Sequence, residues 1–188
     1  MPGETSAVRY TTTAIFLHWA GAILILAGAA LGLVMVELAL SPRKLQWYSY
    51  HKWIGLTVFL IAVARLAWRV YRPAPPFPAS VPAWQQSAAI GMQFLLFLLM
   101  LTVPVLGWLH SSATGVQVVY FGVLPLPDLV ERSKELAELL RLLHRNFVFV
   151  MLAAIAIHAG AALKHHLVDR DQVLARMLPF LKTGAGNP

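Results

Sequence analysis

Thr13–Val36 reads TAIFLHWAGAILILAGAALGLVMV and contains no charged residue. About 20 consecutive, mostly apolar residues are enough for a helix to cross the hydrocarbon core of a bilayer. This stretch therefore predicts a membrane-spanning helix near the N-terminus. It is too long for the apolar region of a signal peptide and no small-residue cleavage site follows it, so we expect it to be retained.

Three further stretches have the same apolar character, at residues 50–70, 87–109 and 145–167. The whole chain is 59% hydrophobic and only 12% charged, whereas soluble domains carry about 25% charged residues. A soluble core therefore cannot be the main destination of its apolar surface. We predict an all-α integral membrane protein, in which residues 1–188 form a single four-helix bundle.

The longest connection joins the third and fourth spans. Within it, residues 129–143 are amphipathic, and the leucines Leu136, Leu139, Leu140 and Leu143 share one helical face. This pattern predicts a short amphipathic helix lying in the membrane interface. A simple extension of the fourth span explains the same pattern. After the second span, the proline-rich run Arg72–Pro78 ends the helix, because proline lacks the N–H donor.

Composition also excludes several kinds of site. The chain has no cysteine, which rules out disulfides, iron–sulfur clusters, thiolate metal sites and a covalent C-x-x-C-H haem attachment. Its net charge is +7, but no basic stretch alternates with aromatic residues as single-strand binders require. We therefore expect anionic lipid headgroups, and no nucleic acid, as the partner of this charge.

An even number of spans places both termini on one side of the membrane. The lysines and arginines divide almost evenly between the two sides, so the positive-inside rule does not choose an orientation.

The chain holds seven histidines: His18, His51, His110, His144, His158, His165 and His166. Ionisable residues inside membrane spans are costly and mark candidate functional sites. A haem held by two histidines needs both at one depth on facing helices. His18 lies about 8 Å inside the start of the first span, and His158 about 9 Å inside the end of the fourth. Since these ends are on the same side, the two histidines share a level.

A second pair follows from the same topology. His51 opens the second span and His144 opens the fourth, and both spans start on the opposite side. His144 and His158 are fourteen residues apart, which is within about 40° of a whole number of helical turns and a rise of about 21 Å. One face of one helix can therefore contribute to two haem sites on opposite sides of the membrane, an arrangement that suits electron transfer across it.

Small residues lie beside these histidines, namely Gly21, Gly55, Ala161 and Ala162. They would let a porphyrin approach the backbone, although small residues are also the usual contacts between membrane helices.

Simpler explanations exist for several of these histidines. His18 follows the pattern of an interfacial residue beside Trp19, and His51 and His144 lie at span ends where solvated histidines are common. His110 is the nearest competitor for the ligand role of His51 or His144. A zinc site is a poor alternative, because no acidic or cysteine partners accompany the histidines.

Motifs along most of the chain resemble the bacterial cytochrome b561 family, from about Arg9 to Pro179. The motifs are Leu17-His18-Trp19, His51 with Gly55, Arg72-Pro73-Ala74-Pro75-Pro76, Pro104-Val105-Leu106-Gly107-Trp108, Phe121-Gly122, Leu124-Pro125, His158 to His166, Asp169-Arg170-Asp171 and Arg176-Met177-Leu178-Pro179. No single motif decides the resemblance; their order and spacing carry it.

The resemblance implies two b haems, with His18 and His158 as axial iron ligands of one and His51 and His144 as ligands of the other. It implies a bacterial inner-membrane protein with both termini cytoplasmic, and electron exchange with membrane quinone. Some members look like superoxide:quinone oxidoreductases. The chain departs from the family at His110, where a hydrophobic residue is usual, and at Arg145, where an acidic residue is expected.

The leading hypothesis is an electron carrier that takes electrons from a periplasmic donor, either superoxide or a periplasmic redox protein, and passes them to quinone. The alternative is a haem b subunit that relays electrons to or from a partner dehydrogenase and has no enzyme activity of its own. Candidate quinone-binding residues are His165, His166, Arg9 and Lys164, with headgroup contact as the simpler role. Candidate residues for steering an anion such as superoxide are Lys44, Lys52, Lys134, Arg141 and Arg145, with ordinary interfacial anchoring as the simpler role.

Overall fold

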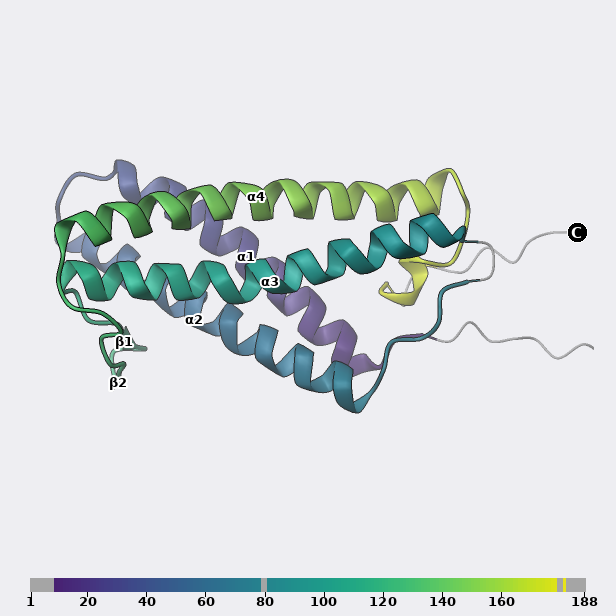
Figure 1. Ribbon diagram of the computed structural model, residues 1–188, viewed down its shortest axis with the longest axis horizontal. Helices are drawn as coiled ribbons and strands as arrows, with labels where there is room; N and C mark the ends of the chain where they lie inside the picture. Colours follow the sequence, from purple (N-terminus) through teal and green to yellow (C-terminus); the bar gives the residue numbers. More distant parts are fainter. Residues whose placement is uncertain (1–8, 79–80, 179–180, 182–188) are drawn as a thin grey trace, which may run out of the picture.

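Four long helices dominate the computed structural model, which describes residues 9–78, 81–178 and 181 (Figure 1). They are α1 (Thr12–Glu37), α2 (Pro42–Tyr71), α3 (Ala83–Thr114) and α4 (Lys134–Leu167). The short elements are the antiparallel strands β1 (Val119–Tyr120) and β2 (Leu124–Pro125), and the 3₁₀ turn η1 (Leu174–Arg176). All four helices are long and apolar enough to cross a membrane, so the predicted all-α membrane bundle is confirmed.

Local capping signals determine where the helices begin and end. The hydroxyl oxygens of Thr11, Ser41 and Ser133 accept hydrogen bonds from the first turns of α1, α2 and α4. Pro42 occupies the first turn of α2, where its missing N–H costs nothing, and the helix therefore starts well before the predicted span. At the end of α3, Gly115 takes the left-handed conformation with φ of 75°.

The amphipathic segment before the fourth span is part of α4. The structure has no separate helix here among the described residues, and α4 runs without a break from Lys134 to Leu167. The expectation of a helix lying in the interface is therefore wrong, and the alternative of an extended fourth span is correct. Part of the leucine face packs against α3, since Leu140 and Ala137 are buried together with Ala113, whereas Leu139 is exposed.

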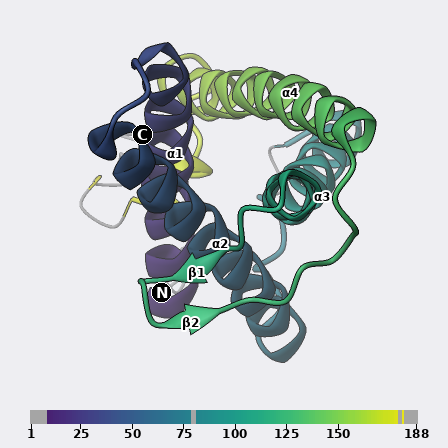
Figure 2. The ribbon, with the colours of Figure 1, turned by 90° about the vertical axis from the view of Figure 1, so that its left-hand side faces the viewer.

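The helices pack in the order α1–α2–α3–α4. Close packing joins α1 to α2, α2 to α3 and α3 to α4, whereas α4 makes few close backbone contacts with α1 or α2 in the described part of the chain. An end-on view shows the four helices around a common centre (Figure 2). Contacts between α4 and the α1–α2 pair are therefore made mainly by side chains.

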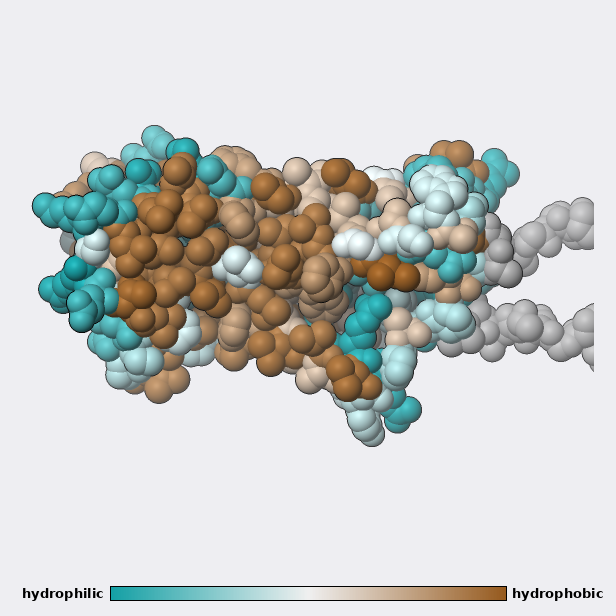
Figure 3. All heavy atoms as spheres, in the orientation of Figure 1, coloured by the Kyte–Doolittle hydropathy of each residue, from teal (hydrophilic) through white to brown (hydrophobic). Residues whose placement is uncertain are grey.

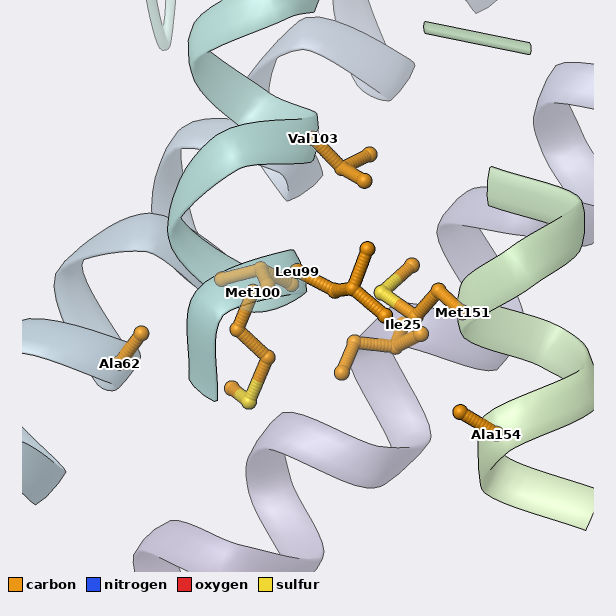
Figure 4. Close-up of a cluster of buried hydrophobic side chains, with 8 residues drawn as sticks. Ile25, Ala62, Leu99, Met100, Val103, Met151 and Ala154 are labelled. Carbon is orange, nitrogen blue, oxygen red and sulfur yellow. The ribbon is translucent and has the colours of Figure 1, made fainter. Parts of the chain in front are cut away.

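Apolar side chains fill the middle of the bundle. The buried cluster comprises Ile25, Val58, Ala62, Leu99, Met100, Val103, Met151 and Ala154, and draws on all four helices (Figure 4). On α4, the cluster residues Met151 and Ala154 lie between His144 and His158 in sequence. A packed apolar layer therefore separates the two histidine levels.

The outer surface of the bundle is apolar as well. Many large side chains are exposed on it, including Phe16, Ile23, Phe94 and Ile157, each more than 60% exposed. Figure 3 shows a broad hydrophobic band across one face, with hydrophilic residues gathered at the ends. Soluble monomers rarely leave large contiguous apolar patches in water, and lipid chains are the natural partner of such a band.

A small β-hairpin caps one end of the bundle. It docks against α2, where the Trp53 indole donates a 2.7 Å hydrogen bond to the Val119 carbonyl and the hydroxyls of Thr57 and Tyr120 lie 2.9 Å apart. We call this end, which also holds the α1–α2 connection, the hairpin end. The opposite end, with the start of α1, the end of α4 and η1, is the tail end (Figure 1).

Candidate functional site

Four histidines form two pairs inside the bundle, one near each end. At the hairpin end, the ring centroids of His51 on α2 and His144 on α4 are 6.0 Å apart, with their planes at 82°. At the tail end, the ring centroids of His18 on α1 and His158 on α4 are 6.2 Å apart, with planes at 63°. These are the side-chain pairs expected from depth. We call them the hairpin-end pair and the tail-end pair.

Both histidines of the hairpin-end pair are bonded to the backbone of a neighbouring helix. His51 Nδ1 lies 3.0 Å from the Gly28 carbonyl oxygen of α1, and His144 Nδ1 lies 2.9 Å from the Val103 carbonyl oxygen of α3. A carbonyl oxygen only accepts, so Nδ1 must carry the proton in both rings. The other ring nitrogen, Nε2, is left without a proton and can bind a metal.

A glycine makes each of these hydrogen bonds possible. A Cβ added at Gly32 would lie 3.0 Å from His51 Cε1, and one added at Gly107 would lie 3.1 Å from His144 Cε1. Both distances are tighter than ordinary contact between a Cβ and a ring. In each case the glycine is four residues after the accepting carbonyl, one helical turn along the same face. Bare backbone at that position lets the imidazole lie close enough to reach the carbonyl.

The tail-end pair has a different environment. Arg65 of α2 places Nη2 3.3 Å from His18 Nδ1, and the edge of Trp19 packs on the His18 ring at 5.2 Å between centroids. Within the described residues, neither His18 nor His158 bonds to a backbone carbonyl. The Arg65 guanidinium therefore lies beside His18 Nδ1, where His51 and His144 each have a backbone carbonyl oxygen.

His110 belongs to neither pair. Its Nδ1 lies 3.0 Å from the Ala137 carbonyl oxygen, so its ring ties the end of α3 to the start of α4. The structure brings His144 to His51 instead, which leaves His110 as a neighbour of the pair and not a member of it.

A cavity adjoins the hairpin-end pair. It is small, with a volume of about 60 Å³, and its lining includes His51, His144, Lys52, Gly55 and Trp108. Val118 and Leu126, from the segments flanking the hairpin, close one side. Most of this lining is apolar, with the two histidines and Lys52 as its polar groups.

The sequence from residue 9 to residue 180 matches the family model described as prokaryotic cytochrome b561. The chain belongs to the prokaryotic cytochrome b561 family. It is 33% identical to cytochrome b561 homolog 2 of Escherichia coli K12, over 90% of this chain and 91% of that protein. It is 30% identical to homolog 1 of the same strain, over 93% and 99%, and 27% identical to the probable superoxide oxidase CybB of Yersinia pestis, over 91% and 96%.

Membership of the family makes this chain a multi-pass inner-membrane cytochrome that binds b-type haem and transfers electrons across the membrane. The histidine pairs fit such a group. An imidazole nitrogen binds a transition metal at about 2 Å, so two rings sharing one metal have centroids about 6 Å apart. The observed 6.0 and 6.2 Å match that separation. With no cysteine in the chain, the haem is held without a covalent bond.

The candidate quinone residues lie at the tail end and differ in what they contact. Lys164 forms a 2.7 Å ion pair with Asp169. His165 Nδ1 lies 2.6 Å from an Asp171 carboxylate oxygen and 3.1 Å from Asp169. His166 is half-buried, and Arg9 is exposed.

His165, Asp169 and Asp171 also lie close enough together to hold a metal ion. Two of their carboxylate oxygens are already engaged, one by Lys164 and one by the backbone N–H of Val173 at 2.9 Å. The cluster is therefore better explained as an oriented histidine than as a metal centre.

The candidate steering residues divide into two groups. Lys44 donates to the Leu38 carbonyl at 2.6 Å, and Lys52 donates to the Val116 carbonyl at 3.2 Å, so both stabilise connections at the hairpin end. Lys134, Arg141 and Arg145 are exposed along the first part of α4. Only these last three present free charge to the solvent among the described contacts.

Sequence reasoning missed Gly32, Gly107 and Arg65. The signal for two of them was available, because Gly32 and Arg65 lie fourteen residues after His18 and His51, the spacing that separates His144 from His158. The small residues that sequence reasoning favoured have other surroundings. Gly21 faces Ile61 and Met100 at ordinary contact distance, and Gly55 has open space beside it.

Proposed function

We propose that the chain binds two b haems, one between His51 and His144 and one between His18 and His158. The observation that carries this proposal is the pair of ring separations, each suited to one shared iron, at the two ends of one face of α4. Iron with two histidine ligands has no open position, so such haems exchange electrons and bind no substrate directly.

Electrons would enter at the hairpin end and leave at the tail end. We place the hairpin end in the periplasm and both termini in the cytoplasm, following the family resemblance. Superoxide is the favoured donor, since a relative from Yersinia pestis is named a probable superoxide oxidase. Two superoxide ions would give up one electron each and become oxygen. One quinone would take both electrons with two protons and become quinol.

The exposed cations of α4 support an anionic donor. Arg141 and Arg145 are four residues apart on one helical face near the hairpin end, and Lys134 lies two turns before Arg141. A row of exposed positive charge raises the local concentration of an anion and accelerates its encounter. These residues would therefore increase the rate of electron entry without contacting the iron.

His165 is the favoured quinone contact at the tail end. It lies seven residues after His158, which is within about 20° of two full turns and about 10 Å further along the same face. Its ring is held by Asp171, whose other oxygen accepts from the Val173 N–H. The Trp19 indole bonds at 2.9 Å to the Met177 carbonyl and fastens this segment to α1. An imidazole oriented by a carboxylate can deliver a proton to a quinone oxygen.

Purified protein in lipid nanodiscs tests the function. We expect a low-spin b-type spectrum, rapid haem reduction on addition of superoxide, and quinol formation when ubiquinone is present. Reduction by a partner dehydrogenase, with no response to superoxide, would instead support the role of a haem subunit in a larger complex. Absence of any haem would reject both.

A further inference from the structure

Arg65 is a half-buried cation at the level of the tail-end pair. It lies on α2 fourteen residues after His51, which puts it on nearly the same face and about 21 Å deeper along the helix. The geometry agrees, since its guanidinium contacts His18. Helix α2 therefore provides a histidine at one level and an arginine at the other.

The described surroundings of Arg65 contain no anion bonded to it. Its Nη1 lies 3.9 Å from the Met100 sulfur, and its guanidinium carbon lies 5.0 Å from the centroid of the Phe97 ring. No carboxylate forms an ion pair with it among residues 9–78 and 81–178. A guanidinium inside a membrane bundle is costly unless a negative group accompanies it.

The contact with His18 cannot supply that partner once the histidine binds iron. A histidine that binds metal through Nε2 carries its proton on Nδ1, and arginine has only donors. Two donors would then face each other across 3.3 Å, and the guanidinium must turn its N–H groups to another acceptor. The hairpin-end pair has no such conflict, because carbonyl oxygens accept from both of its Nδ1 atoms.

We propose that Arg65 binds a propionate carboxylate of the haem at the tail-end pair and that its charge raises the reduction potential of this haem. This inference rests on the proposed two-haem function. A haem carries carboxylates, and arginine pairs with them through two parallel hydrogen bonds. A nearby fixed positive charge stabilises the reduced state, which holds one more electron. This effect favours electron flow from the hairpin end to the tail end.

Redox titration of the holoprotein, followed in the haem absorption bands, tests this role. In Arg65→Gln we expect the equilibrium between the two haems to shift at least about tenfold toward reduction of the hairpin-end haem, which for a one-electron couple is about 59 mV. Arg65→Lys should restore part of the difference, because it keeps the charge but not the planar fork. Arg69→Gln is the matched control, since it removes an exposed charge one turn away that bonds to Gln93.

Single-haem backgrounds assign the effect to one site. With His51→Ala, which leaves the tail-end haem, Arg65→Gln should still lower the potential; with His158→Ala it should change nothing. If Arg65→Gln weakens haem binding, selective loss of the tail-end haem supports the inference, and equal loss of both haems overturns it. Unchanged potentials with both haems bound overturn it as well. A wild-type protein with a single haem would instead overturn the two-haem proposal. A lack of superoxide or quinone activity would count against the proposed electron donor and acceptor, and not against the role of Arg65.

Discussion

Replacing Gly32 by alanine should weaken haem binding at the hairpin-end pair while leaving the fold intact. The added Cβ would lie 3.0 Å from His51 Cε1 and 3.4 Å from His51 Nδ1, so the ring must retreat by a few tenths of an ångström. The bond from Nδ1 to the Gly28 carbonyl is already 3.0 Å, and that retreat takes it beyond the usual limit of about 3.2 Å.

The size of the effect follows from the lost hydrogen bond. A hydrogen bond of this kind contributes about 1 kcal/mol net, and loss of a group that orients a metal ligand typically costs about 10-fold or more in affinity. We therefore expect the affinity for the hairpin-end haem to fall about tenfold. The stability of the haem-free helix bundle should not fall, because alanine favours a helix over glycine by roughly 1 kcal/mol.

Haem titration of the purified apoprotein, with competition by a soluble haem acceptor, measures this affinity. Gly160→Ala is the matched control, because a Cβ at Gly160 meets nothing within 4 Å. The tail-end haem provides an internal reference in the same molecule. Wild-type affinity at both sites in Gly32→Ala, or an equal loss at both, would refute the reasoning from the backbone contact.

Three further predictions concern the other parts of the pathway. His158→Ala should lose one haem and keep the other, as the haem-to-protein ratio will show; retention of both would reject its assignment as a ligand. The double variant Arg141→Gln/Arg145→Gln should slow haem reduction by superoxide several-fold at low salt in stopped-flow measurements. The difference in rate should vanish at about 1 M salt, because charges are then screened within about 3 Å. A loss of rate that does not depend on salt would argue against steering. Asp171→Asn should slow quinone reduction while leaving both haem spectra unchanged, whereas an unchanged rate would remove His165 from the quinone site.

The side-chain pairs could be predicted from the sequence because they depend on depth alone. Spans that alternate in direction fix which residues share a level, and the helical rise gives the distance from each end. His18 and His158, and likewise His51 and His144, therefore pair whatever the details of packing. Their role as iron ligands is a proposal that these distances support.

The groups that orient the histidines could not be predicted from the sequence. Which carbonyl meets His51 or His144 depends on how far each neighbouring helix is rotated, and rotation is set by packing between side chains. Arg65 could be placed near the end of a span, but its contact with His18 appears only when α1 and α2 are side by side. The fourteen-residue spacing between His144 and His158 also separates His51 from Arg65, but spacing along one helix does not show that Arg65 contacts a histidine of another.

The segment before the fourth span was misjudged for a different reason. An interfacial helix and an extension of a span have the same 3.6-residue period, so the leucine pattern of residues 129–143 cannot separate them. Ser133 marks the true start, because its hydroxyl caps α4. The hairpin was not anticipated either, since strands of two residues are too short to show alternation.

The haem-to-protein ratio of the purified chain, determined from its reduced absorption spectrum and a separate protein assay, tests the central proposal most directly. Two low-spin b haems per chain are expected, one for each histidine pair, with one remaining in His51→Ala and one in His158→Ala. A ratio of one in the wild-type protein, or a ratio of two that survives both substitutions, would contradict the assignment of the two pairs.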